Sequence, residues 1–557
     1  MPEKLRESFG VNNSQPFYAR HGLACLIGLA CLQAALYLGL LGLSRQFQLS
    51  VEETTRPILA VLALLALLFV SYLGSLWLVI RLPSTKGLVG GLFAFAVLIR
   101  IIMLFSQPIQ EVDLYRYIWD GSVSNQGVSP YRYPPSTVMG TFNARIDDND
   151  IGDRDLAKLV SQIQSKPGLR DVLSHVHFAE VPTVYPPVSQ VVFRISDFLT
   201  PSRADITLRL RVMKFVIVLF DIGVMFFLWL LLRSVDFHPG WSIAYGWSPL
   251  VIKEFANSGH LDSIAVFLMM AALVVLVSQF KKQWLSVGGS AALLASAFGA
   301  KLFPIVLAPL FAVFVWRQIG LKWAAIWCVV FVMTAGFVML PLMRSHEVPQ
   351  QAEIANPSED ELRGFKLFLS RWEINDVIFM AVQENIRPDG AVANQPKLWF
   401  VVTPNRFRVS VTNSLSTWFA GDVERTPFLA TRLFLTMVFG GIVLLRLYRT
   451  WNDESTLLES AFLIVAWFWL LLPTQNPWYW TWALPLVAFT RNRSWLWLSG
   501  LALIYYSRFW FQYHFESIGD WGGYQGVLIF DFIVVWFEFL PFFVLLLGSW
   551  VWPRKTV

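Results

Sequence analysis

The chain has 557 residues, of which 55% are hydrophobic and 15% charged, and its mean hydropathy is +0.53. A water-soluble domain could not bury so much apolar surface, so this composition excludes an ordinary globular enzyme. The net charge of +6 comes from Lys and Arg that are spread over short loops instead of forming one patch, which argues against a nucleic-acid partner.

Apolar runs of about 20 residues recur along the chain from Gly22 onward, each long enough to cross a bilayer. Backbone groups in hydrocarbon must pair internally, so these runs are expected to be helices. The first three are expected at 22–44, 57–80 and 87–106. Over the whole chain the pattern predicts an all-α polytopic membrane protein with about 13–14 transmembrane helices, several of them short or broken.

The basic loop residues predict the topology. If the basic residues near the N-terminus are inside, the same choice places nearly all later basic loops inside as well, with both termini cytoplasmic. Two long external segments remain, at about 107–208 and 343–427, and we expect short interfacial helices in them. The chain then divides into N-terminal helices (1–106), a first external loop (107–208), central helices (209–342), a second external loop (343–427) and C-terminal helices (428–557).

The first external loop opens with QEVDLYRYIWDGSVSNQGVSPYRYPP, which contains three acids, Glu111, Asp113 and Asp120. Positions 113, 116, 117 and 120 share one face of a helix, so a helix over 111–124 would place two carboxylates beside Arg116 at the membrane edge. An interfacial helix with ordinary ion pairs explains this spacing equally well. Further evidence is therefore needed to assign a function to this motif.

Other polar turns fall on the same predicted face of the membrane. They are the YPP motif that begins at Tyr185, the turn with Glu254, His260 and Asp262, Lys301 in GAKLFP, and the segment TQNPWYWTW. A lone His or Asp at such a turn is usually a hydrogen-bonded cap. Several ionisable groups at one membrane level are costly unless they are used, which favours a shared site.

These motifs resemble the glycosyltransferase C superfamily. Within it, the run DLYRYIWDG with SPYRYPP, the later YPP, the segment from WSPL to SGHLD, KLFP and NPWYWTW are most similar to bacterial polyprenyl-phosphate-mannose-dependent mannosyltransferases and to the catalytic mannosyltransferase of glycosylphosphatidylinositol assembly. The likeness covers about 87–490, with a weaker match at FKLFLSRWEINDVIF. The long stretch 136–182 and the acidic motif E-V-D, in place of D-x-D, depart from the pattern. They leave the use of a divalent metal and the acceptor open.

The resemblance implies transfer of one hexose, mannose by the family pattern, from a polyprenyl-phosphate sugar to an acceptor hydroxyl at the outer or lumenal face. The acceptor is a glycolipid, a polysaccharide or a protein, and the membrane is expected to be a bacterial plasma membrane. A single carboxylate can act as general base for an inverting transfer. Asp113 matches the position of the family's base, with Glu111 and Asp120 as the alternatives.

The same resemblance suggests residues that bind the substrate. Fixed positive charge near the phosphate would help it to leave, and sugar rings commonly stack on aromatic side chains. The candidates for the phosphate are Arg116, Arg132, His260 and Lys301. The expected walls of the site are Tyr133, Tyr185, Trp372, Trp478 and Tyr479, and the remaining candidates are Tyr117, Tyr131, Glu254, Asp262 and Asn375.

Two other classes of protein stay open. A lipid or solute transporter would also have many helices, and Asp221 inside a predicted span favours that class. A glycan ligase would also carry external acids. Formation of a glycosidic bond distinguishes an enzyme from a transporter.

Overall fold

A computed structural model describes residues 16–48, 50–144, 151–278, 283–343, 373–391, 397–419, 421–490, 492–515 and 524–551. Within these ranges the secondary structure is helical, and the β-type interaction is an isolated parallel bridge between Ile374 and Thr474. The all-α prediction is therefore confirmed. Trp372, Lys4, Arg6, Arg554 and Lys555 lie outside the described residues.

Eight helices in the described part of the chain are long and apolar enough to cross a membrane, or nine if one bent pair counts as a span. Helix α16 illustrates their character, because Val332, Met333 and Phe337 are 63%, 70% and 73% exposed. Such surfaces are stable in lipid and not in water. The protein is a multi-pass integral membrane protein. The long helices are α2 (Pro16–Ser44), α3 (Ile58–Val79), α4 (Lys86–Leu104), α10 (Ile206–Ser234), α16 (Leu321–Met343), α20 (Thr426–Asn452), α21 (Leu457–Leu471) and α26 (Val535–Val551).

The expected 13–14 spans exceed this number because several apolar runs are broken into short helices. Prolines begin many of these pieces, since proline fits the first turn of a helix and cannot continue one. The pieces are α11 (Ile243–Gly246), α12 (Pro249–Val251), η4 (Ile252–Asn257), α13 (Asp262–Val277), α14 (Gln283–Ala300), η5 (Phe303–Leu307), α15 (Ala308–Ile319), α22 (Pro477–Trp480), η8 (Leu484–Phe489), α23 (Ser494–Leu501), η9 (Ala502–Tyr506) and α24 (Ser507–Phe515). By contrast, α25 (Val527–Ile529) and η10 (Phe530–Val534) continue into α26 as one span. Within the described residues, length and composition support eight or nine spans instead of 13–14.

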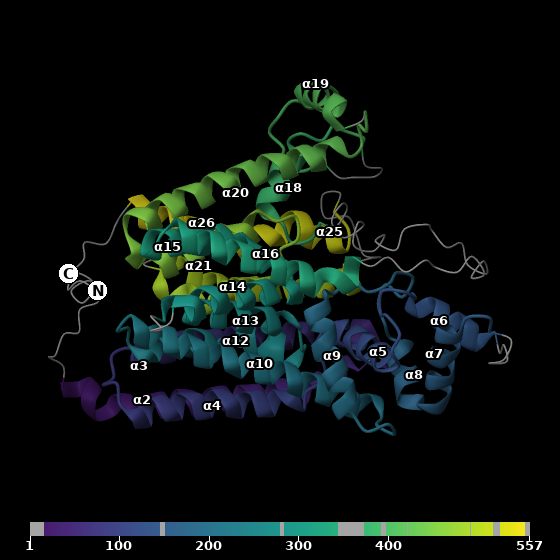
Figure 1. Cartoon of the computed structure of the whole chain (residues 1–557), viewed down its shortest axis with the longest axis horizontal. Helices are drawn as coiled ribbons and strands as arrows, with labels where there is room; N and C mark the ends of the chain where they lie inside the picture. The colour runs from purple at the N-terminus through teal and green to yellow at the C-terminus, as the bar shows by residue number, and fades with distance from the viewer. Residues whose placement is uncertain are drawn as a thin grey trace.

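The long helices run alongside one another, and the helices of the first long loop gather at one end of the bundle (Figure 1). These are α5 (Asp113–Asn125), α6 (Pro135–Asn143), α7 (Arg154–Ser165), α8 (Pro167–Leu173) and α9 (Pro187–Leu199). The expected helix at 111–124 thus exists with slightly shifted ends. It packs closely on α9, because a Cβ on Gly121 would lie 2.3 Å from the carbonyl oxygen of Phe193. Only glycine allows this approach.

The second long segment contains α18 (Val377–Glu384) and α19 (Asn405–Ser416), which lie near α20 in the upper part of Figure 1. The Ile374 amide donates to the carbonyl oxygen of Pro473 at 3.0 Å, and the Gln475 amide donates to the carbonyl oxygen of Ile374 at 2.9 Å. These bonds attach the second long segment to the turn that precedes α22.

Helices α4 and α10 are held together by a charged pair inside the bundle. The Arg100 guanidinium donates to both oxygens of Asp221, at 2.6 and 3.0 Å, and the Tyr245 hydroxyl donates to Asp221 at 2.7 Å. Both charged side chains are fully buried. Every oxygen of Asp221 therefore has a partner, which is what a structural ion pair in a membrane requires.

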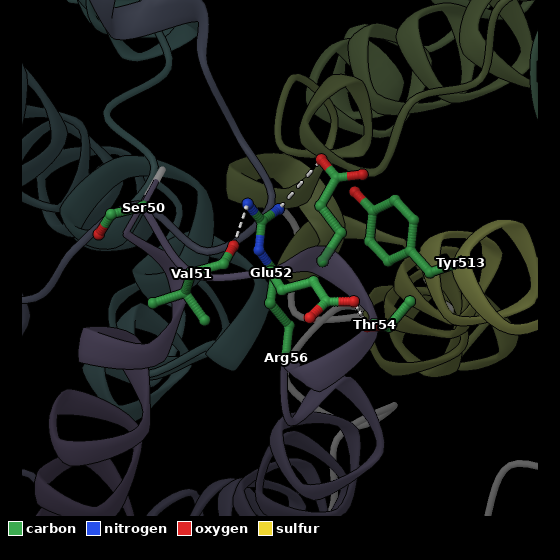
Figure 2. Close-up of a pocket in the computed structure, with 7 residues that line it drawn as sticks. Ser50, Val51, Glu52, Thr54, Arg56 and Tyr513 are labelled. Carbon is green, nitrogen blue, oxygen red and sulfur yellow. Dashed lines mark hydrogen bonds and ion pairs between the residues drawn. The ribbon is translucent and has the colours of Figure 1, made fainter.

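A pocket of about 600 Å³ lies beside the segment that leads into α5. Figure 2 shows residues that line it. The Arg56 guanidinium lies beside the Tyr513 ring, donates to the carbonyl oxygen of Val51 and forms an ion pair with Glu53. Arg56 donates to the side chain of Gln110 at 3.1 Å. The pocket is thereby joined to the residue that directly precedes Glu111.

Candidate active site

Asp113 is the first residue of α5 and a partly exposed acid, with 36% of its side chain accessible. The hydroxyl of Tyr117, one turn later on α5, donates to its Oδ2 at 3.3 Å. This pairing follows from the helical spacing of four residues. One carboxylate oxygen is thus oriented by the protein, while the group as a whole remains accessible to a substrate.

A π-helical turn, η4, carries Glu254 toward the start of α5. Asn257 in this turn fixes the preceding segment, because its side chain accepts from the Ile109 amide at 3.0 Å and donates to Ser106 Oγ and to the Gln107 carbonyl at 2.7 Å. π-Helical turns often occur at functional sites. Here the turn brings an acid from the middle of the sequence beside the acidic motif of the first loop.

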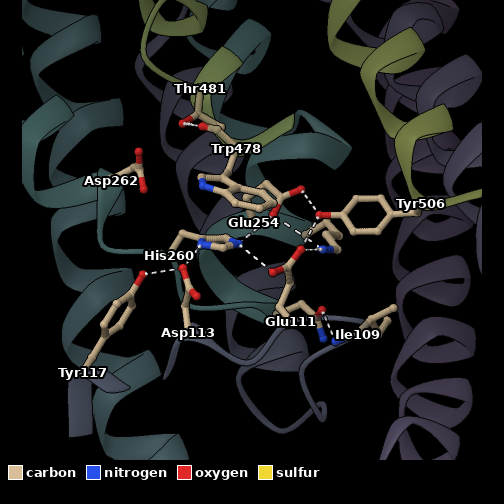
Figure 3. Close-up of polar contacts among 12 residues, drawn as sticks. Ile109, Glu111, Asp113, Tyr117, Glu254, His260, Asp262, Trp478, Thr481 and Tyr506 are labelled. Atoms are coloured by element: carbon tan, nitrogen blue, oxygen red, sulfur yellow. Dashed lines mark hydrogen bonds and ion pairs between the residues drawn. The ribbon is translucent and has the colours of Figure 1, made fainter. Parts of the chain in front are cut away.

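His260 follows directly and lies between three carboxylates (Figure 3). Its Nε2 is 3.4 Å from Glu254 and 3.7 Å from Glu111, and its Nδ1 is 3.9 Å from Asp113. The ring is buried and stacks on Trp478, with centroids 4.2 Å apart and planes 12° apart. Within the described part of the chain neither ring nitrogen makes a hydrogen bond, so short movements of the acids would suffice to complete one.

Lys253 and Tyr506 close the buried side of this cluster. The Lys253 ammonium is 3.5 Å from Glu254, 3.8 Å from Glu111 and 3.6 Å from the centroid of the Tyr506 ring. The Tyr506 hydroxyl lies 2.7 Å from Glu254 and 3.2 Å from Glu111. Burial raises the pKa of Glu111 to about 7, against the attraction of Lys253 and then of His260. Both glutamates are therefore held by a cation and a hydroxyl.

A second charged pair sits on the other side of His260. The Lys301 ammonium is 2.7 Å from Asp262 Oδ1, which also accepts from the Trp482 indole at 2.5 Å. Lys301 lies over the Tyr479 ring, 4.4 Å from its centroid. The residues at positions 260–262, 301 and 478–482 come from separate turns, and the fold brings them together as predicted.

Tyrosines form a wall near Asp113. The rings of Tyr117 and Tyr185 meet edge to face with centroids 4.9 Å apart, and the Tyr131 hydroxyl donates to the carbonyl oxygen of Tyr185 at 2.8 Å. Burial raises the pKa of Tyr185 and of Tyr479, and the negative charge of Asp113 contributes to both shifts. Both phenols therefore lie close enough to Asp113 to sense its charge.

Asp120 and Arg116 follow Asp113 on α5 and pair with each other. Asp120 is almost fully buried, accepts from Gln190 at 3.1 Å and lies 3.6 Å from the Arg116 guanidinium, which also donates to the carbonyl oxygen of Val181 at 2.5 Å. Burial raises the pKa of Asp120. The two residues tie α5 to Gln190 of α9 and to Val181 in the segment before α9, and in the described part of the chain the Arg116 guanidinium forms its ion pair with Asp120.

Arg132 and Tyr133 face elsewhere. Arg132 binds Asp153 at 3.0 Å and Asp155 at 2.7 Å, and the Tyr133 hydroxyl donates to Asp153. Their partners belong to the stretch 136–182, which the sequence presents as an insertion. That stretch is built into the loop through these contacts, and the two residues serve its packing.

Asn375 connects the second long segment to the helical bundle. Its amide donates to the Gln475 carbonyl oxygen at 3.1 Å and to Glu538 at 3.0 Å. The residue has a φ of +58°, an uncommon backbone conformation that asparagine tolerates better than most residues. These contacts are with α26 and the turn before α22, so Asn375 anchors the second long segment, and its expected role on the substrate stays a prediction.

The acids fit a divalent metal poorly. Among the described residues, ligand atoms of Glu111, Glu254 and His260 all lie within 4.8 Å of one another, as a metal site requires. The ammonium of Lys253 already lies against both glutamates. A +2 ion about 4 Å from this charge would be repelled by about 8 kcal/mol at an effective dielectric constant of about 20.

Lys253 and Tyr506 were not predicted from the sequence. Lys253 is adjacent to Glu254 in the sequence, which is the one signal that could have drawn attention to it. Tyr506 stands in the apolar run LALIYYSRFW and looks like a packing residue. Only the rotation of η9 about its axis places its hydroxyl on the two glutamates.

No family model, curated protein or solved structure matches this chain. The fold and the hydropathy of its helices establish an all-α, multi-pass integral membrane protein.

Proposed function

We propose that the protein is a membrane glycosyltransferase that moves one hexose, with mannose as the first candidate, from a polyprenyl-phosphate sugar to an acceptor hydroxyl. The observation that carries this proposal is the position of Asp113. Its accessible carboxylate stands at the end of the helical bundle, among residues from four separate polar turns. We place the protein in a bacterial plasma membrane with both termini in the cytoplasm and this site on the outer face.

Asp113 acts as the general base. A carboxylate oxygen of Asp113 takes the proton of the acceptor hydroxyl. At the same time the oxygen of that hydroxyl attacks the anomeric carbon of the sugar. The bond between this carbon and the phosphate oxygen breaks on the opposite face, and the polyprenyl phosphate leaves with the electron pair. The new glycosidic bond has the inverted configuration, and no covalent enzyme intermediate is needed.

His260 and Lys301 supply positive charge for the departing phosphate. His260 is 3.9 Å from Asp113, and Lys301 is joined to the same region through Asp262 and Tyr479. Fixed charges of this kind stabilise negative charge that develops in the transition state. Arg132 binds two carboxylates of the stretch 136–182 and is a weaker candidate for this role, whereas Arg116 stays a candidate, because its Nη1 atom is buried and has no hydrogen-bond partner among the described residues.

The acceptor enters through the pocket beside Arg56. Arg56 and Tyr513 both contact Gln110, which is three residues before Asp113. A chain of three residues spans at most about 11 Å, so Gln110, which contacts two residues of the pocket lining, lies within about 11 Å of Asp113 along the chain. The aromatic ring of Tyr513 is suited to stack on a sugar.

The hypothesis that the protein is a transporter was based mainly on Asp221. Asp221 suggested transport because it lies inside a span, but both of its oxygens are occupied by Arg100 and Tyr245. A carboxylate that carries a substrate or an ion must be able to exchange partners. Asp221 is explained by the packing of α4 on α10.

The test is transfer of labelled hexose by purified protein. Wild type should form a glycosidic product from a polyprenyl-phosphate hexose, and Asp113→Asn should fold but lose about 10²–10⁴-fold in rate, the usual contribution of a general base. Asp171→Asn is the matched control, because Asp171 is an exposed acid in the same loop. Turnover by Asp113→Asn equal to that of wild type would refute the assigned base.

A further inference from the structure

Three potential metal ligands and one lysine share the same small volume. Glu111, Glu254 and His260 present their ligand atoms within 4.8 Å of one another, a group that could hold a divalent ion. The ammonium of Lys253 lies 3.5 Å from Glu254 and 3.8 Å from Glu111. A metal on these oxygens would need to stand beside a buried positive charge.

We propose that the ammonium of Lys253 is the resident cation of this cluster and takes the place that a divalent metal would have between Glu111, Glu254 and His260. The site then works without a metal ion, and removal of the Lys253 side chain turns it into a metal site. The statement about catalysis rests on the proposed glycosyl transfer. The statement about metal binding rests only on the geometry.

The fold fixes Lys253 in this position. Lys253 and Glu254 are neighbours in the π-helical turn η4, so both side chains approach Glu111 from the same turn. The ring of Tyr506 lies 3.6 Å from the ammonium, and a cation is attracted to the face of such a ring. The Tyr506 hydroxyl holds both glutamates from the same side. Lysine is thus positioned by groups that also position the acids.

Burial leaves the cluster dependent on an internal cation. Lys253 is 2% exposed and Glu254 is fully buried. Buried carboxylates are strongly destabilising unless a cation or several donors compensate them. Without the ammonium, the two glutamates and the imidazole form a set of oxygen and nitrogen ligands that suits a transition metal such as Mn²⁺ or Zn²⁺.

The experiment measures Mn²⁺ binding to the full-length protein after exhaustive chelation, by electron paramagnetic resonance of the free ion. Wild type should bind no stoichiometric Mn²⁺ up to about 1 mM. Lys253→Ala should gain one site per chain that is tighter than any wild-type site by about ten-fold or more. The double variant Lys253→Ala with Glu254→Gln should lose this site again.

Lys214→Ala is the matched control. Lys214 is also a buried lysine of the bundle, but it donates to the carbonyl oxygens of Met103 and Ser106 at 2.9 and 2.8 Å. Its removal should create no Mn²⁺ site. Lys253→Arg keeps the charge and should bind no metal either. Added Mn²⁺ should raise the melting temperature of Lys253→Ala and leave that of Lys214→Ala and wild type unchanged, because a ligand stabilises the state that binds it.

Two results would overturn the proposal. One is stoichiometric Mn²⁺ binding by wild type that Glu254→Gln abolishes, which can be read whether or not the lysine variants fold. The other is a folded Lys253→Ala or Lys253→Met that binds Mn²⁺ no tighter than wild type. If wild type transfers no sugar, the glycosyltransferase proposal fails while the metal-binding result stands. Transfer by wild type that survives chelation supports both.

Discussion

Removal of the Asp221 carboxylate should destabilise the helical bundle strongly. Asp221→Ala leaves the Arg100 guanidinium buried without its counter-ion, and it also removes the acceptor of the Tyr245 hydroxyl. Breaking a buried pair in this way costs about 3–5 kcal/mol. If all 557 residues unfold in one step, this corresponds to a fall of about 3–4 °C in melting temperature.

The assay is thermal unfolding of purified protein in one detergent at fixed pH and salt. The double variant Arg100→Leu with Asp221→Leu is the control, because replacement of both charges by apolar groups is often neutral in a buried site. It loses the Arg100 bonds to the carbonyl oxygens of Ala96 and Gly246, so recovery should be large but incomplete. A double variant as unstable as Asp221→Ala would refute the reasoning, and so would an unchanged melting temperature for the single variant.

Three further outcomes are expected. Burial and then Glu373 raise the pKa of Asp376 well above its usual value, so its proton is held more tightly in the folded state. Protonated Asp376 therefore contributes to the free energy of unfolding of wild type, fully below about pH 4 and less as pH rises. Because asparagine at this position does not titrate, the melting temperature of Asp376→Asn relative to wild type should increase from about pH 4 to about pH 8. Gly259→Ala should cost about 1–3 kcal/mol of stability, since φ is +70° and the new Cβ would lie 2.7 Å from Leu114, and a melting temperature equal to wild type would contradict this. Asp120→Ala should lower the free energy of unfolding by about 3–5 kcal/mol, seen as a lower melting temperature, and should also lower the transfer rate; a purely kinetic effect measured on stable protein would contradict its structural role.

Hydropathy was sufficient to predict the fold class and most of the spans. It overestimated their number because a run of apolar residues does not show where a helix will break, and prolines such as Pro249 and Pro477 divide several runs. The helix at the acidic motif was predicted within two residues at its N-terminus, since its ends follow from local spacing.

The convergence of His260, Asp262, Lys301 and Trp478 could be expected because the loop charges place their turns on one side of the membrane. The partners of individual side chains could not. Arg132 pairs with acids 21 and 23 residues later. Such contacts depend on how helices rotate against one another, which neither periodicity nor charge reports.

The central claim is that Asp113 and the turns around it form a glycosidic bond. The most direct measurement reconstitutes wild-type protein in vesicles with a polyprenyl-phosphate hexose labelled in the sugar and an oligosaccharide acceptor, and follows the label. We predict that the label appears in a glycosidic bond of inverted configuration while polyprenyl phosphate is released in equal amount. Movement of intact labelled lipid between the two leaflets, with no product bond, would contradict the account.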